Sequence, residues 1–97
     1  MQEGLALIER AYDKAPDNAA VVDSLGWALY RLGRVAEALP HLQRAAELSP
    51  DAEVLAHLAQ ALWRDEQRDA ARTALERARA IDPQHRAVLG ADGWINP

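Results

Sequence analysis

The sequence predicts an all-α fold in which antiparallel helix pairs stack into a right-handed superhelical array. Three observations support this prediction. Residues 19–50 return in modified form as residues 52–83, at an offset of 33 positions. Apolar residues in both stretches recur every three or four positions, which is the spacing of an amphipathic helix. A proline closes each unit, at Pro16, Pro50 and Pro83. Self-similarity with a period of this length is typical of helical repeat proteins.

The two stretches agree at positions that would pack inside a helix pair. The matches are Leu25 with Leu58, Leu29 with Leu62, Tyr30 with Trp63, Ala38 with Ala71, Leu42 with Leu75, Ala45 with Ala78 and Pro50 with Pro83. We therefore divide the chain into four parts. They are the second helix of a partial repeat (1–16), two complete repeats (17–50 and 51–83), and a short capping turn with a loose tail (84–97).

An amphipathic helix is predicted for the first 15 residues. Its apolar positions fall at helical spacing, and its charged residues point elsewhere. It should end before Pro16, because proline disfavours helix at the preceding residue. The apolar stripe consists of Leu5, Ile8, Ala11 and Tyr12. Aligned on Pro16, the segment corresponds to the second half of each later repeat, so its partner helix is expected to be absent.

The first helix of the first complete repeat should cover about residues 19–32. Asp17 and Asn18 are both good N-cap residues. Gly33 should end the helix, because glycine readily takes the left-handed conformation found at helix C-termini.

The second helix of this repeat should cover about residues 35–48 and bury Leu48 with the other apolar residues of its stripe. Pro40 argues against this helix because it lacks the N–H that the helical ladder needs. We expect a small kink there, or a tightened first turn.

The second complete repeat follows the same plan. Asp51 should cap a helix over residues 52–64, and this helix should lead to a turn at residues 65–68. This turn has no glycine, so we expect it to be less sharply defined than the turn at Gly33. Asp69 is expected to cap the next helix, which should run to Ile81 with that residue facing inward.

Beyond Pro83, residues 84–90 are expected to form two helical turns. The tail at residues 91–97 should be extended or loosely packed, because Gly90, Gly93 and Pro97 interrupt a regular helix.

Composition excludes several classes of function. The net charge of −4 argues against a nucleic-acid-binding protein, which would carry a basic face. The absence of cysteine excludes disulfides, thiolate metal sites and cysteine nucleophiles. No apolar run approaches the ~20 residues of a membrane span, and the N-terminus does not read as a signal peptide. The compartment stays open: cytoplasmic by default, or the cell envelope or periplasm if the segment belongs to a longer exported protein.

The spacing resembles the tetratricopeptide repeat. The family places Leu-Gly between two aromatic positions in the first helix, then Ala, an aromatic, Ala and a closing Pro. Leu25-Gly26 matches the central pair, and Leu58-Ala59 stands in its place in the second repeat. The resemblance covers residues 1–83. Leucine replaces the large aromatics, and Val22 and Leu55 take the usual tryptophan position. The segment DSLGWALYRLGR is also similar to the final repeats of proteobacterial cell-envelope proteins that act as adaptors.

The resemblance implies a concave groove, lined by the first helices, that holds a peptide or a partner helix. The groove residues would be Ala20, Asp23, Trp27, Tyr30, Arg31, Glu53, Ala56, Gln60, Trp63 and Arg64, with His57 near them. Trp27 and Arg31 lie four residues apart, away from the leucine stripe. Aromatic residues beside arginine are typical of binding hot spots. We therefore expect Trp27 and Trp63 to anchor the partner and Arg31 and Arg64 to hold its acidic groups.

Two alternatives to this groove stay open. The aromatic residues could pack between helices without touching a ligand, and the arginines could be solvated surface residues. Some family members clamp the C-terminal carboxylate of chaperones with Lys, Asn and Arg. The corresponding positions here hold Asp23, Trp27, Ala56 and Gln60, so we do not expect that mode of binding.

The sequence does not predict an enzyme, a cofactor or a metal site. No two of His41, His57 and His85 have the spacing of a metal motif such as H-E-x-x-H, and a surface role is expected for His57. We therefore expect an adaptor module that binds a protein or peptide segment carrying acidic groups. The alternative is a structural spacer or self-assembly unit of a larger repeat protein, and open array ends could also support a homodimer.

Overall fold

The computed structural model describes residues 2–95, with the backbone alone for residues 2, 3 and 94. The predicted all-α array of antiparallel helix pairs is confirmed. The described helices are α1 (Gln2–Lys14), α2 (Ala19–Arg31), α3 (Val35–Leu48), α4 (Ala52–Arg64), α5 (Arg68–Ile81) and α6 (Arg86–Ile95). None of them is both long enough and apolar enough to cross a lipid bilayer.

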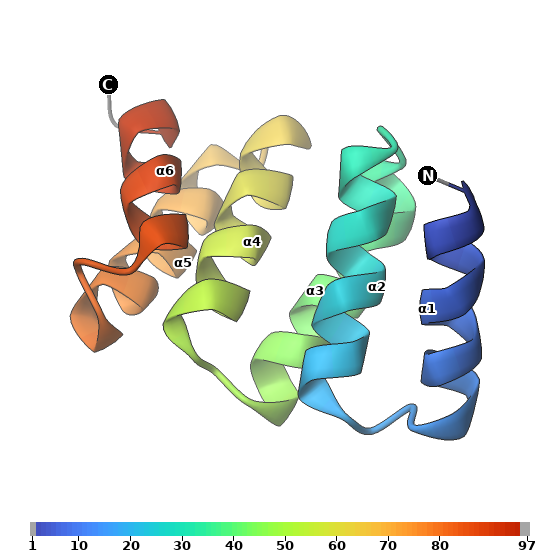
Figure 1. The fold of residues 1–97 in the computed structure, drawn as a ribbon. Helices are drawn as coiled ribbons and strands as arrows, with labels where there is room; N and C mark the ends of the chain where they lie inside the picture. The colour runs from blue at the N-terminus through green and yellow to red at the C-terminus, as the bar shows by residue number, and fades with distance from the viewer. Residues whose placement is uncertain (1, 96–97) are drawn as a thin grey trace.

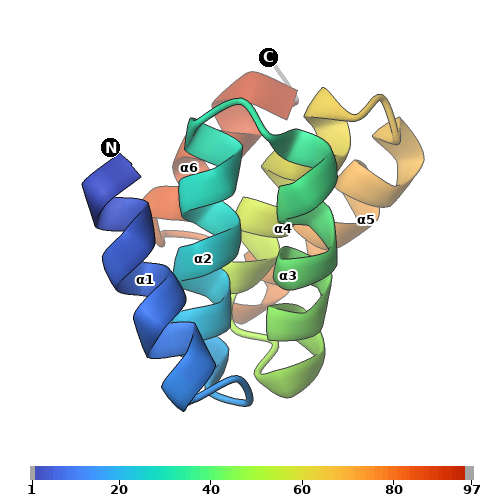
Figure 2. The same cartoon turned by 90° about the vertical axis from the view of Figure 1, so that its right-hand side faces the viewer.

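The helices form two layers. Helices α2, α4 and α6 lie in one layer, and α3 and α5 lie behind them (Figure 1). The closest packing joins α2 to α3 and α4 to α5, and α1 packs against α2. Figure 2 shows α1, α2 and α3 from the N-terminal side of the array. The molecule measures 36 × 24 × 19 Å.

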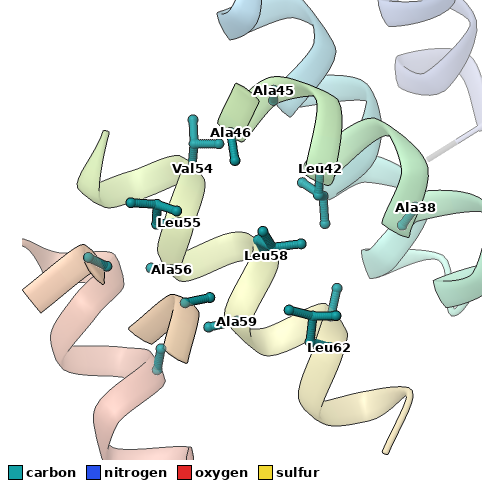
Figure 3. Close-up of a cluster of buried hydrophobic side chains, with 14 of the residues drawn as sticks. Ala38, Leu42, Ala45, Ala46, Val54, Leu55, Ala56, Leu58, Ala59 and Leu62 are labelled. Carbon is teal, nitrogen blue, oxygen red and sulfur yellow. The ribbon is translucent and has the colours of Figure 1, made fainter. Parts of the chain in front are cut away.

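The core runs through both layers. Leu42 and Ala46 of α3 face Leu58 and Leu62 of α4 (Figure 3), and these residues are at most 7% exposed. Leu48 and Ile81, which the sequence predicts to face inward, are instead exposed. Each is the last residue of its helix, and the next residue is extended. The chain therefore leaves the helix before another turn can cover either side chain.

The helix starts follow the predicted caps in part. Asn18 Oδ1 accepts a hydrogen bond from Val21 N (3.2 Å), and Asp51 Oδ1 accepts one from Val54 N (2.9 Å). The prediction that Asp69 caps α5 is wrong. Helix α5 begins at Arg68 with Gln67 as its N-cap, so Asp69 lies inside the first turn. Helix α3 continues through Pro40, and the kink expected there stays a prediction.

The two turns within the helix pairs have the same geometry. Gly33 and Glu66 both take positive φ, at 82° and 63°. In each turn a backbone N–H donates a hydrogen bond to the carbonyl oxygen five residues earlier. The N···O distance is 2.9 Å both for Arg34 N to Leu29 O and for Gln67 N to Leu62 O. The expectation of a less defined second turn is therefore wrong. The hydrogen bonds that close the turn come from the backbone, so they form with either residue.

The predicted loose tail is helical in the described residues. Helix α6 extends to Ile95, and Val88, Ala91 and Ile95 are buried. Arg79 of α5 also forms an ion pair with Asp92. Burial of this apolar stripe outweighs the low helix propensity of the glycines. Residues 96–97 lie outside the described residues.

Gly26 sets the distance between α2 and α3. A Cβ built on Gly26 would lie 2.7 Å from Leu42 Cγ, 2.8 Å from its Cδ2 and 3.2 Å from its backbone nitrogen. Ala59 holds the same position in α4 and is fully buried with its Cβ in place. The first helix pair is thus packed too closely for any side chain at this position.

Gly26→Ala should lower the free energy of unfolding by about 1–3 kcal/mol, because overpacking displaces Leu42 and its backbone. The control is Gly90→Ala, since a Cβ at Gly90 meets nothing within 4 Å. This control should raise stability by about 0.5–1 kcal/mol through helix propensity. Urea denaturation measures both changes, and a stabilising Gly26→Ala would contradict the close contact.

Glu66→Gly should raise the free energy of unfolding by about 0.5–1 kcal/mol. A non-glycine residue in the left-handed region is strained by about 1–2 kcal/mol, and the greater freedom of glycine in the unfolded chain offsets part of the gain. Gly33→Ala should change stability in the opposite direction. Urea denaturation midpoints measure both effects, provided that the slope of unfolding free energy against urea concentration is unchanged. A loss of stability in Glu66→Gly would show that the turn is unstrained.

Candidate functional site

A stack of aromatic rings joins α2 to α4. The Trp27 ring lies 4.7 Å from the Tyr30 ring and 3.9 Å from the His57 ring, between centroids, with interplanar angles of 10° and 13°. Tyr30 follows Trp27 by three residues on the same helix face, whereas His57 belongs to the neighbouring helix. The indole is therefore held in place by contacts within α2 and across the layer.

Asp23 fixes the other edge of the His57 ring. The Nδ1 atom of His57 lies 3.0 Å from Oδ1 and 3.1 Å from Oδ2 of Asp23, and both residues are buried. The surface role expected for His57 is therefore wrong. Its burial comes from residues of another helix, which its own local sequence does not reveal.

A pocket lined in part by charged side chains opens beside this stack, between the layer helices α2, α4 and α6. We call it the α4–α6 pocket, and its volume is about 590 Å³. Its lining combines an aromatic ring with groups of both charges. The lining residues are Trp27, Glu53, His57, Gln60, His85, Arg86, Ala87 and Gly90.

A second, more apolar pocket of about 370 Å³ lies between α1 and α2. We call it the α1–α2 pocket. It is lined by Gly4, Leu5, Ile8, Ser24, Trp27, Ala28, Arg31 and Leu32. Trp27 lines both pockets, so its ring marks the boundary between an apolar and a polar part of one surface.

The structure brings most of the predicted groove residues together. Trp27, Tyr30, Glu53, His57 and Gln60 belong to the stack or the α4–α6 pocket, Asp23 contacts His57 of the stack, and Arg31 belongs to the α1–α2 pocket. The Arg64 guanidinium lies 5.5 Å from the centre of the Tyr30 ring. Ala56 is buried, and Ala20 is exposed.

Trp63 has a different environment from Trp27. It is half-buried, and the guanidinium carbons of Arg68 and Arg72 lie 4.3 Å and 5.4 Å from the centre of its ring. It lines neither the α4–α6 pocket nor the α1–α2 pocket. Trp63 therefore packs beneath arginines of α5, although it matches Tyr30 in the repeat alignment.

The sequence analysis did not assign His85 and Arg86 to the site. They lie at the start of α6, which was expected to be two turns followed by a loose tail. The Nδ1 atom of His85 accepts a hydrogen bond from Ala87 N at 3.0 Å, and its Nε2 lies 3.7 Å from Glu53 Oε2. The one signal in the sequence for a longer helix here was a histidine followed by an apolar stripe. The nearby glycines, which disfavour a helix, led to the prediction of a loose tail.

Comparison with known families and structures agrees with this architecture. The tetratricopeptide repeat family matches residues 29–92, and a second tetratricopeptide repeat family profile matches residues 2–53. Each of these matches covers more than half of the chain.

The TPR repeat-containing protein PA4667 of Pseudomonas aeruginosa is 45% identical over 56 residues, a match that spans 58% of this chain and 10% of that protein. The solved structure of MamA AMB-1 superposes with a TM-score of 0.79 at 28% identity, over 96% of this chain and 58% of that one. MamA MSR-1 gives a TM-score of 0.75 at 28% identity, over 97% and 57%. The chain thus spans little more than half of these structures. The helix pairs, the 33-residue offset and these matches show that the chain belongs to the tetratricopeptide repeat family.

Proposed function

We propose that this chain is a protein-interaction module that holds an extended segment of a protein partner against the layer of α2, α4 and α6. The single observation that carries the proposal is the position of Trp27, which lines both pockets. A segment lying across its ring would reach the apolar and the polar pocket together. The module needs no chemistry of its own for this role.

The Trp27 ring suits an anchoring role. It is half-buried, so part of its surface stays open to a partner. The stack with Tyr30 and His57 holds it in one orientation, and a side chain that is already ordered loses little entropy on binding. Tryptophan is among the residues most enriched at energetic hot spots.

Charge favours a partner with acidic groups. Arg31 borders the apolar pocket, and Arg86 borders the polar one. Among the described residues, no carboxylate pairs with either arginine, whereas Arg34, Arg44 and Arg79 have Glu37, Asp17 and Asp92 as ion-pair partners. We infer that the preferred segment carries an apolar side chain for the α1–α2 pocket and a carboxylate for Arg31.

Self-assembly is the second candidate function. Leu7 of α1 is 64% exposed and Leu89 of α6 is 51% exposed, so both outer helices present an apolar side chain to solvent. Repeat proteins bury such faces on neighbouring repeats. On this reading, the chain serves as a spacer or stacks against another copy, and the surface around Trp27 holds no ligand.

Trp27→Ala should weaken peptide binding by more than about 10-fold, because it removes the anchor shared by both pockets. Peptides are first selected from a displayed random library on the immobilised protein, and their affinities are then measured by fluorescence polarisation. Trp63→Ala is the matched control and should change affinity by less than about threefold, since Trp63 lines neither pocket. Circular dichroism checks that both variants fold. Failure to select any peptide, or equal affinity of the peptides for Trp27→Ala, would favour the spacer reading.

Arg31→Glu should weaken binding of the selected acidic peptides by about fivefold or more and should reduce the salt dependence of their affinity. Arg77→Glu is the control, because it makes the same charge change beside Glu47 and Leu58, away from both pockets. Titration at two salt concentrations measures the effect. Equal losses in the two variants would mean that net charge, and not Arg31, selects the partner.

A further inference from the structure

We propose that Asp23, Glu53 and His57 form a binding site for a divalent transition-metal cation, with Zn²⁺ as the best match. The site lies at the edge of the α4–α6 pocket, which Glu53 and His57 also line, and its test measures metal binding in the absence of any peptide. One ligand atom from each of the three residues lies within 4.8 Å of the other two. Spacing along a single helix does not reveal this site, because the three residues come from two helices.

The helices hold the three groups in fixed relation. Glu53 and His57 are four residues apart on α4, so they lie one turn apart on the same face. Asp23 reaches the site from α2. The Trp27 ring stacks on His57 and restricts its rotation. A metal site needs ligands that are positioned before the ion arrives, and packed helices provide such positions.

The charges around the site favour a cation. Asp23 is 7% exposed, and His57 is the only basic residue paired with it among residues 2–95. Glu53 brings a second carboxylate to within 4.8 Å. A buried carboxylate requires compensation by hydrogen bonds or by opposite charge, and the His57 ring supplies one such partner. A divalent ion would balance both carboxylates.

The distances require only a small adjustment. The Nδ1 atom of His57 lies 3.0 Å and 3.1 Å from the two oxygens of Asp23. A tetrahedral zinc ion with bonds of about 2.0–2.2 Å holds neighbouring ligand atoms about 3.4 Å apart. The Asp23–His57 pair would therefore widen slightly to admit the ion, and the exposed Glu53 side chain, whose ligand atom lies within 4.8 Å of the other two, would rotate toward it.

His85 lies beside Glu53 at the edge of the site and is not one of its ligands. Its Nδ1 accepts the Ala87 N–H, so that nitrogen carries no proton. The Nε2 atom lies 3.7 Å from Glu53 Oε2, which is too far for a direct hydrogen bond. The protein then supplies three ligands, and water from the pocket takes the fourth position, as in open zinc sites.

The donor set selects among metals. Imidazole together with carboxylates suits Zn²⁺ and its first-row neighbours. Calcium prefers six to eight oxygen ligands, which this cluster does not provide. The chain has no cysteine, so no thiolate competes for the ion.

The test is calorimetric titration of chelator-treated protein with ZnCl₂. Wild type should bind one equivalent of Zn²⁺. Glu53→Gln and His57→Gln should each weaken binding by more than about 10-fold. Glu47→Gln and His41→Gln are matched controls, because Glu47 lies elsewhere and His41 packs edge-on against Tyr12. Each control should leave the affinity within about twofold of wild type.

Glu53→Gln is the decisive variant, because Glu53 is exposed and its substitution should leave the fold intact. Titration with Co²⁺ gives a second readout, since tetrahedral coordination by wild type should produce visible absorption bands that Glu53→Gln lacks. The proposal is overturned if wild type shows no saturable binding, or if Glu53→Gln and His57→Gln titrate like wild type.

Discussion

The close approach of α2 to α3 at Gly26 is the contact on which the rest of the array depends. With no side chain at that position, Leu42 lies directly against the α2 backbone and is fully buried. That approach orients α2 so that its leucines face the core while Asp23, Trp27 and Tyr30 face α4 or the pockets. The second pair repeats the arrangement with Ala59, and α4 then carries His57 to the Trp27 ring.

The proposed binding surface is thus formed by the stacking of repeats, and no single helix contains it. The aromatic stack and the Asp23–His57 pair both join α2 to α4, and the α4–α6 pocket forms only because α6 extends the layer. Two properties meet at Trp27, because an apolar pocket lies on one side and a polar pocket on the other. A partner anchored at Trp27 and a cation held by Asp23, Glu53 and His57 are therefore proposed for the same face.

Helix positions were predictable from the sequence because they depend on local signals that the repeat shows twice. The Asn18 and Asp51 caps and the turn at Gly33 are examples. Features that depend on contacts between residues far apart in the sequence were not predictable. His57 is buried by Asp23, which lies 34 residues away. The glycines of α6 suggested a loose tail, yet burial of Ala91 and Ile95 makes it helical. Trp63 matches Tyr30 in the alignment but lies beneath Arg68 and Arg72. The first repeat has no arginine at either of the equivalent positions.

The most direct test of the central claim uses the indole N–H signals of Trp27 and Trp63 in a ¹⁵N–¹H NMR titration with a selected peptide. The two rings lie in different environments on the same molecule, so each serves as the reference for the other. The account predicts that the Trp27 signal shifts to saturation, together with backbone amides of α2, α4 and α6, while the Trp63 signal stays in place. A saturating shift of Trp63 with Trp27 unchanged, or shifts confined to α3 and α5, would contradict it.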